Sequence, residues 1–525
     1  GGYGRMRRMS TNAQKDLTPV VPRKYRSIFF MLVSCFALWG LLNNMTDNLV
    51  PAFKNIFTIP QEKAALVQVA FYGAYAVLAI FASILIEEFS YKKGVLIGLG
   101  VYILGALCYI PACINQSFDI YFIAIFVVAA GCSVLETTCN PYVISLGPEK
   151  TAVRRLNFAQ AFNPVGSICG IFLAQQLILS NLNPATADER ALMPAEQLKE
   201  IVHTELFWVC APYVGLCAIA FFIWLFFLRA QDTQEAAAAE APATGSGKGG
   251  IRVLVAALFA VVPLTVLYFL FPDMDKVHWV LYGTLGPIVY LFLVGDYRAM
   301  LFSLLSQPRY WCGVIAQFFY VGVQIAAWTY LNVYCCKELG VTPATAATYY
   351  LISIILFIVC RWVATYYMKK FNPASMMSLF AIGAIAACAG VIYLPSTVLF
   401  TIGGLDFSAN VLCLIAMSGC MSLMFPTIYG IALGGLNQRD VKLGAAGLIM
   451  AILGGALITP WMAGIIGDAE GAWLCLTTAF DNTWDTNLGT SHAAVRASFI
   501  VPAICFAVVL LYSLIFRKPT TTSDK

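Results

Sequence analysis

Two carboxyl side chains lie inside long apolar stretches of the chain. They belong to Asp47, in the segment NNMTDN, and to Glu136, in the segment LETTCNP. An ionised side chain at the centre of a membrane helix costs about 2.5 to 3.5 kcal/mol on insertion scales, so such residues usually face a cavity and have a function. A low-dielectric pocket favours the protonated carboxyl, which can load a proton on one side and release it on the other. We therefore predict that both acids handle protons or substrate. The alternative is that they only join neighbouring helices.

Amide and aromatic side chains recur at helical spacing around these acids. Asn43 and Asn44 share a helix face with Asp47, and Asn157, Gln160 and Asn163 line one face of a later helix. Amides both donate and accept hydrogen bonds, which suits sugar hydroxyls, and Trp and Tyr offer flat faces to a pyranose ring. The predicted substrate-binding residues are Glu136, Asn43, Asn44, Gln68, Tyr72, Asn140, Gln160, Asn163, Gln324 and Trp328. Each amide by itself is as consistent with helix-to-helix contact, so the prediction rests on the set.

A buried cation is a weaker candidate. Arg361 lies in an apolar stretch, but Lys369 and Lys370 follow it within about two turns. A long Arg side chain near a helix end can extend to the membrane surface. We therefore expect Arg361 to be a helix-end cation outside the site.

Composition places the whole chain in a membrane. Of its 525 residues, 60% are hydrophobic and 11% are charged, whereas soluble domains are about 25% charged. Three histidines lie far apart, and zinc-protease, C-x-x-C and phosphate-loop motifs are missing from the sequence. We expect no metal, no cofactor and no enzymatic activity. The 17 cysteines lie mostly in apolar runs and are expected to pack as small hydrophobes. The net charge of +5 comes from short basic clusters and does not indicate nucleic-acid binding.

Apolar windows of about 20 residues predict the membrane-spanning helices. Six windows lie near 27–50, 64–86, 93–113, 120–146, 156–180 and 205–229, and six more near 309–335, 346–368, 374–394, 408–434, 442–466 and 495–516. Two further apolar runs, 251–271 and 277–294, follow a charged, Ala- and Gly-rich linker. If both cross the membrane, the chain has about fourteen spans. The alternative is a re-entrant hairpin, because the second run is short.

We therefore predict an all-α polytopic membrane protein with two six-helix halves and an extra pair of transmembrane helices between them. The expected segments are a cytoplasmic tail (1–26), an N-terminal half (27–229), a linker (230–250), an extra hairpin (251–295), a C-terminal half (305–516) and a second tail (517–525). Gly40 and Pro141 recur at similar offsets as Gly322 and Pro426, which suggests a parallel duplication with a substrate site between the halves.

Charge asymmetry predicts the orientation. With a cytoplasmic N-terminus, all but seven of the 32 Lys and Arg residues fall on the inner side, as the positive-inside rule requires. Both termini are then cytoplasmic. The first ten residues have no apolar core and cleavage site, so we do not expect them to be a signal peptide.

Several of these segments resemble one known family. FALWGLLNNMTDNLVPAF, LETTCNPYVISLGPEKTAVRRLNFAQAFNPVGSICG and FPTIYGIALGGL resemble the fucose permease branch of the major facilitator superfamily, and the likeness covers both halves. It implies the major facilitator fold and a sugar:proton symporter of the bacterial inner membrane that works by alternating access. It also implies that Glu136 belongs to the sugar and proton site, with Asp47 as its protonatable partner. The expected partners are a sugar, protons and membrane lipid, without nucleic acid, and the expected functional unit is a monomer.

The chain also departs from the superfamily pattern. Its usual G-x-x-x-D-R-x-G-R-R loop is replaced by SILIEEFSYKKG, and the extra helix pair and the 468–494 loop have no counterpart in a twelve-helix design. The leading hypothesis is L-fucose:proton symport. The alternatives are symport of glucose, galactose or N-acetylglucosamine, and a sugar sensor that binds without transport.

Overall fold

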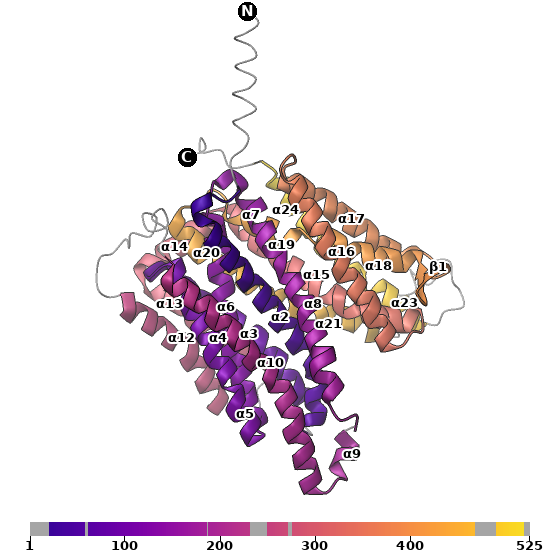
Figure 1. Ribbon diagram of the computed structural model, residues 1–525. Coiled ribbons are helices and arrows are strands. Elements are labelled where there is room, and N and C mark those ends of the chain that lie inside the picture. The colour runs from indigo at the N-terminus through magenta and orange to yellow at the C-terminus, as the bar shows by residue number, and fades with distance from the viewer. Residues whose placement is uncertain are drawn as a thin grey trace, which may run out of the picture.

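The computed structural model describes residues 20–57, 61–185, 187–230, 249–270, 276–467 and 490–518. Most of its helices form two bundles, one from each half of the chain (Figure 1). The first bundle consists of α2 (Arg26–Ile56), α3 (Gln61–Glu88), α4 (Tyr91–Leu107) with α5 (Tyr109–Asn115), α6 (Phe118–Ser145), α7 (Ala152–Gln160) with α8 (Phe162–Leu173), and α10 (Ala195–Arg229). The short helix α9 (Ala187–Ala191) precedes α10.

The second bundle repeats this plan of long and broken helices. It consists of α15 (Pro308–Glu338), α16 (Pro343–Tyr367), α17 (Pro373–Tyr393), α18 (Ala409–Met421) with α19 (Met424–Leu433), α20 (Gln438–Met450) with α21 (Gly454–Gly467), and α23 (Thr490–Ala497) with α24 (Ile500–Ile515). Between the bundles in sequence lie α12 (Gly249–Leu270), α13 (Lys276–Leu293) and α14 (Gly295–Leu305).

One hairpin departs from the all-α prediction. Strands β1 (Val398–Ile402) and β2 (Leu405–Ser408) pair antiparallel, with Ile402 opposite Leu405. The β-branched and aromatic residues of β1 favour a strand. Gly403 and Gly404 then form a two-residue turn with positive φ angles of 60° and 79°, a conformation that favours glycine. The turn between α17 and α18 is therefore a short β-hairpin and not a plain loop.

The predicted number of membrane spans can be compared with the helices of the described residues. Among the described residues, 11 helices are long and apolar enough to cross a membrane, or 12 if the bent pair of α13 and α14 counts as one span. The bend between Tyr282–Leu293 and α14 is 104°. The prediction of about fourteen spans is thus not confirmed, whereas a helical protein built largely of membrane-spanning helices is.

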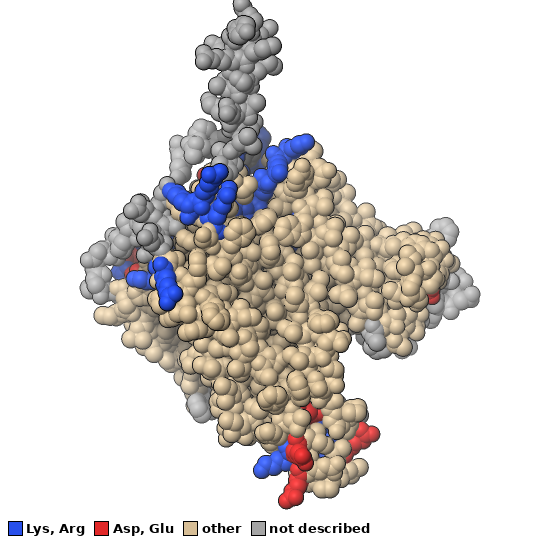
Figure 2. Space-filling model, viewed as in Figure 1, with Lys and Arg blue, Asp and Glu red and all other residues tan. Residues whose placement is uncertain are grey.

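Charged side chains gather at the two ends of the molecule (Figure 2). Lys and Arg cluster at the end where the described part of the chain begins and ends, and acidic residues with a few basic ones lie at the opposite end near α9. The wide surface between them is largely uncharged in this view, and the exposed apolar side chains of the described helices include Phe172, Phe222 and Leu511. Such a surface suits contact with lipid hydrocarbon rather than water.

Glycines bring the first and fifth helices of each bundle close together. A Cβ atom on Gly40 of α2 would collide with the backbone of Asn163 in α8, and one on Gly322 of α15 would collide with Ile458 in α21. Small residues at such contacts let membrane helices pack closely. The predicted correspondence of Gly40 and Gly322 therefore matches equivalent packing positions in the two bundles.

The two bundles converge toward one end and diverge toward the other (Figure 1). They meet where α7 lies against α19 and α3 lies against α20, near the termini, and they separate toward α9 and β1. Asn157 of α7 donates to the hydroxyl of Thr427 in α19 at 3.2 Å. Arg439 of α20 donates to the Glu87 carboxylate of α3 at 2.6 Å. These contacts between the bundles thus close one side of the molecule.

Candidate functional site

Glu136 lies in the middle of α6 with only 7% of its surface exposed. Tyr75 of α3 lies close to its side chain. Tyr429 of α19 lies close enough to the same carboxyl to interact with it electrostatically. Residues of both bundles therefore lie near Glu136. Among the described residues, no Lys or Arg forms an ion pair with Glu136. A buried carboxyl without a cation partner is suited to bind and release a proton.

A chain of hydrogen bonds runs from the helix of Glu136 to the second bundle. Asn140 donates from Nδ2 to the backbone carbonyl of Glu136 at 2.8 Å. Gln160 of α7 donates from Nε2 to the Asn140 Oδ1 atom at 2.7 Å. Arg361 of α16 donates from Nη1 to the Gln160 carbonyl at 2.8 Å. Since Asn140, Gln160 and Arg361 are all buried, this chain connects the two bundles without an exposed link.

Two prolines explain why Arg361 binds backbone carbonyls. A helical carbonyl normally accepts from the N–H group four residues later, and proline has no N–H group. Pro164 therefore leaves the Gln160 carbonyl without its helical partner, and Pro426 does the same for Ser422. Arg361 donates to both carbonyls, through Nη1 to Gln160 and through Nε to Ser422. One guanidinium thus satisfies an interrupted helix in each bundle.

The expectation that Arg361 is a helix-end cation was wrong. Only 4% of the residue is exposed, and its guanidinium lies over the Phe357 ring at 4.5 Å from the centroid. The side chain turns inward because the two free carbonyls accept its hydrogen bonds, which compensates for the lost contact with water. Arg361 therefore belongs to the boundary between the bundles rather than to the membrane surface.

We expect the Arg361→Gln variant to be markedly less stable than the parent protein. Its shorter neutral side chain leaves at least one buried carbonyl without a donor, which should lower the free energy of unfolding by about 3 kcal/mol. Thermal unfolding of the purified proteins in detergent measures this loss. Lys369→Gln removes a cation from the exposed segment after α16 and serves as the control. Equal melting temperatures for the two variants would show that the carbonyls do not depend on Arg361.

The predicted amides of α2 and α8 divide into two kinds. Asn44 donates from Nδ2 to the Ser167 hydroxyl at 2.8 Å and to the Gly40 carbonyl at 3.2 Å, so it joins α2 to α8. Asn43, by contrast, keeps a buried Oδ1 atom that accepts no hydrogen bond among the described residues. Asn163 is half-buried and its carbonyl accepts from Ser167. Asn43 therefore has free capacity for a ligand, whereas Asn44 acts mainly as a link between helices.

The second bundle contributes a polar and aromatic face on α15. Gln324 is half-buried and forms no side-chain hydrogen bond among the described residues. Trp328 donates from Nε1 to the Ser418 hydroxyl at 3.2 Å and packs edge-to-face on Phe357. Trp328 is therefore held in place by α16 and α18, while Gln324 keeps free hydrogen-bonding groups.

Sequence reasoning missed Gln317, two turns before Gln324 on the same face of α15. Gln317 is fully buried, and neither its Oε1 nor its Nε2 atom has a partner among the described residues. A buried amide without partners costs free energy unless a ligand or water satisfies it. The seven-residue spacing from Gln324 was the available signal, since it places both amides on one face.

Three predicted site residues cannot be assigned contacts. Asp47 belongs to α2, and Gln68 and Tyr72 belong to α3. Their side chains lie outside the described residues. Their roles therefore stay predictions. Among the described side chains, no group of three His, Cys, Asp or Glu is arranged to hold a metal ion.

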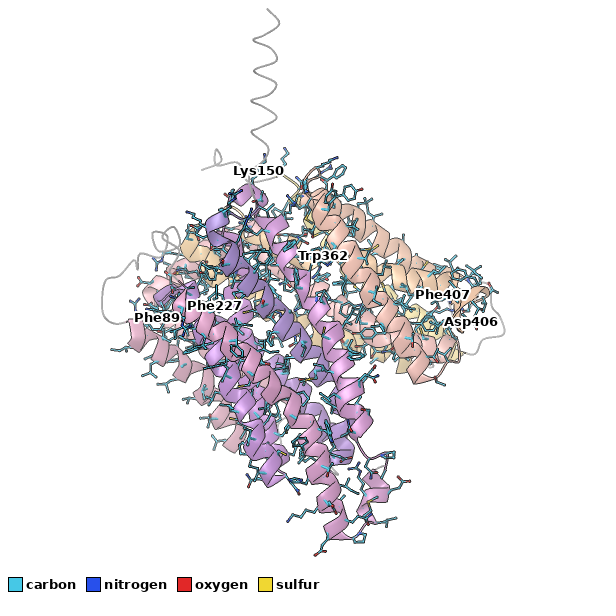
Figure 3. All side chains as sticks on the ribbon, in the orientation of Figure 1. Phe89, Lys150, Phe227, Trp362, Asp406 and Phe407 are labelled. Carbon is cyan, nitrogen blue, oxygen red and sulfur yellow. The ribbon has the colours of Figure 1, made fainter. Side chains whose placement is uncertain are left out.

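An aromatic cluster lies between the bundles beside this site. Trp362 of α16 contacts Phe158 of α7 and Phe162 of α8 edge-to-face, with ring centroids 5.2 and 5.3 Å apart. Figure 3 shows Trp362 where the two bundles meet. On the same side, Gly435 donates its N–H to the Glu149 carboxylate at 3.1 Å. This packing and these bonds hold the two bundles together on this side of the molecule.

Comparison with known proteins identifies similar chains over nearly the full length. The model of the Major Facilitator Superfamily matches residues 28–459. An L-fucose-proton symporter of Haemophilus influenzae is 36% identical over 94% of this chain and 97% of its own length. The L-fucose-proton symporter of Escherichia coli is 32% identical over 95% of each chain. A glucose/galactose transporter of Brucella abortus is 27% identical over 94% of this chain and 95% of its own.

Solved structures of a fucose:proton symporter are also similar to this chain over nearly its full length. The crystal structure of a variant of the E. coli fucose:proton symporter superposes with a TM-score of 0.71 at 28% identity, covering 95% of this chain and 100% of that one. A second structure of that transporter, described as the outward conformation, gives a TM-score of 0.70 at 27% identity with the same coverage. The fold and the arrangement of its two bundles are therefore similar to a fucose:proton symporter.

Proposed function

We propose that this chain, which belongs to the Major Facilitator Superfamily, carries L-fucose together with a proton into the cell. The observation that carries this proposal is Glu136, a buried carboxyl that lies near amides and near residues of both bundles and has no ion-pair partner among the described residues. A proton bound there can change how the bundles interact, which is what coupling of a proton to a sugar requires.

L-fucose is the favoured sugar because of the similarity pattern. The relatives named L-fucose-proton symporters are 36% and 32% identical to this chain. Relatives named glucose/galactose transporters, or putatively so, are 27% and 25% identical. All of them align over more than nine tenths of the chain. Glucose and galactose are therefore the second choice, and N-acetylglucosamine follows.

We assign the end with the clustered Lys and Arg residues to the cytoplasm of a bacterial inner membrane. Both termini are then cytoplasmic, and the closed side is the cytoplasmic side. The site then opens outward, which agrees with the similarity to the outward conformation of a fucose:proton symporter. With α3, α12 and α13 counted as spans, the helices between residues 27 and 516 cross the membrane fourteen times. We propose a lipid-embedded monomer as the functional unit.

We assign different roles to the residues of this site. Glu136 binds the proton and contacts the sugar, with Asp47 as a second protonatable group on α2. Asn43, Gln324 and Gln317 offer amide groups that are free of partners among the described residues. Trp328, held by Ser418, offers an apolar face to the sugar ring. Asn140 and Gln160 position the helix of Glu136 through their mutual hydrogen bond.

Counterflow in proteoliposomes tests transport directly. Vesicles loaded with unlabelled L-fucose should take up external radiolabelled L-fucose transiently, and loading with glucose, galactose or N-acetylglucosamine should support it less well. A protein that only senses sugar would bind L-fucose and give no counterflow. If the protein binds sugar but shows counterflow with none of these four sugars, it is a sugar sensor and not a transporter.

We expect Asp47→Asn to separate exchange from coupling. An Asn at this position cannot release a proton, so uphill accumulation of L-fucose should be lost. Counterflow needs no net proton movement and should stay within about threefold of the parental rate. Uptake by energised cells and counterflow in proteoliposomes measure the two quantities. Parental accumulation in Asp47→Asn would show that this acid is structural.

A further inference from the structure

The helices between the two bundles contact both of them at one end of the molecule. α12 and α13 pack on α3 of the first bundle, and α14 packs on α20 of the second. The bend of 104° before α14 turns the chain from one bundle to the other. Figure 1 shows α13, α14 and α20 together near the end that carries the termini. The inserted segment therefore bridges the boundary between the bundles on their closed side.

The inserted helices hold the first bundle through Glu88, the last residue of α3. Arg252 of α12 donates to the Glu88 carboxylate at 3.1 Å and to Asp296 of α14 at 3.2 Å. The hydroxyl of Tyr297 in α14 donates to the same Glu88 oxygen. The Glu88 side chain is only 10% exposed, so water screens the bonds to its carboxylate weakly. Figure 3 labels the next residue, Phe89, beside the inserted helices.

The same segment holds the second bundle through Asp440 in the first turn of α20. Ser303 of α14 donates to the Asp440 carboxylate at 2.7 Å. Asp440 is buried and also accepts from the side chain of Asn437 at 2.8 Å. The residue before it, Arg439, binds Glu87, which is the neighbour of Glu88 on α3. Lys442 of α20 forms a second ion pair with Glu87 at 3.4 Å, so the bonds of the inserted helices flank two direct ion pairs between the bundles.

We propose that α12 to α14 act as a clamp that stabilises the closed cytoplasmic side of the transporter. This inference rests on the proposed transport function, because alternating access requires that side to open. Opening moves α3 away from α20, and α14 is bonded to both helices. Either the bonds to Glu88 or the bond to Asp440 must then break. The clamp therefore raises the free energy of the inward-open state relative to the closed state.

The test is hydrogen exchange of the purified full-length protein without sugar. The readout is the exchange of α7 and α19, which meet at the closed side and, in the part of the chain that the structure describes, make no substantial contact with α12 or α13. We expect Arg252→Gln to raise their exchange rates about tenfold, the change that corresponds to 1.4 kcal/mol in an opening equilibrium. Arg298→Gln removes an exposed cation of α14 that forms no ion pair among the described residues and is the matched control.

Two further variants make the test specific. Ser303→Ala cuts the link to Asp440 and should also raise exchange in α7 and α19, even if Arg252→Gln fails to fold. The double variant Arg252→Gln with Glu88→Gln should exchange little faster than Arg252→Gln alone, because both changes break the same link.

Exchange that rises only within α12 to α14, or equally in Arg298→Gln, would show a local attachment and overturn the clamp. The measurement needs no sugar. A protein that fails in L-fucose counterflow but shows the expected exchange therefore separates failure of the proposed function from failure of the clamp.

Discussion

The Glu136→Gln variant should lose all uphill accumulation of L-fucose. Glutamine resembles the protonated carboxyl in size and hydrogen bonding, but it cannot release a proton. Internal L-fucose should therefore rise no higher than the external concentration, at any external pH. Uptake of radiolabelled L-fucose by energised cells measures this loss. The uptake is compared at several external pH values, from about 5.5 to about 8.

Asp119→Asn is the matched control for this variant. Asp119 lies in the first turn of the same helix, α6, and its side chain is exposed. We expect this variant to accumulate L-fucose as the parent does, because ionisation of an exposed carboxyl costs little free energy. Uphill accumulation by Glu136→Gln would assign the proton to another group and reduce Glu136 to a structural role.

The second large effect is expected at Gly166 in α8. A Cβ atom there would collide with the backbone carbonyl of Ala37 in α2, and the backbone cannot move aside as a flexible side chain can. Gly166→Ala should therefore lower the free energy of unfolding by about 3 kcal/mol. It should also weaken the bond from Asn44 to Ser167, because that bond spans the same two helices.

Gly215→Ala gives the opposite expectation and serves as the control. Gly215 lies inside α10, and a Cβ atom there meets nothing within 4 Å. Alanine in a helix interior is favoured over glycine by about 0.5 to 1 kcal/mol, so this variant should be slightly more stable. Melting temperatures in detergent measure both changes. A Gly166→Ala variant as stable as Gly215→Ala would refute the close approach of α2 and α8.

Prediction from the sequence succeeded where the burial of a single residue has a free-energy cost of its own. Glu136 could be identified because a carboxyl in an apolar helix needs a reason to be there, and the structure buries it near both bundles. The two helical bundles followed from apolar windows of the length that a bilayer requires. The predicted correspondence of Gly40 with Gly322 agrees with their packing, because each lies at a close contact between two helices of its own bundle.

Other features depend on partners that are distant in the sequence. The place of Arg361 depends on Pro164 and Pro426, which lie 197 and 65 residues away by their sequence numbers and free the carbonyls that it binds. Asn44 joins α2 to α8 because Ser167 lies opposite it in the fold. Neither partner can be read from local spacing, since periodicity gives the face of a helix and not its neighbour.

The number of spans and the β-hairpin show a different limit of prediction from length and composition. Length and composition cannot distinguish a straight span from the bent pair of α13 and α14, whose direction changes by 104° at Val294. The β-hairpin was missed because its strands are only five and four residues long, shorter than the windows used to find membrane helices.

Joint movement of L-fucose and protons is the central property that we propose for this protein. Sugar-induced pH change in a weakly buffered suspension of de-energised cells expressing the protein tests it directly. We predict that L-fucose makes the medium more alkaline, because each sugar molecule entering the cell takes a proton with it. L-fucose entry without alkalinisation, or no response to L-fucose, glucose, galactose or N-acetylglucosamine, would contradict proton-coupled sugar symport by this protein.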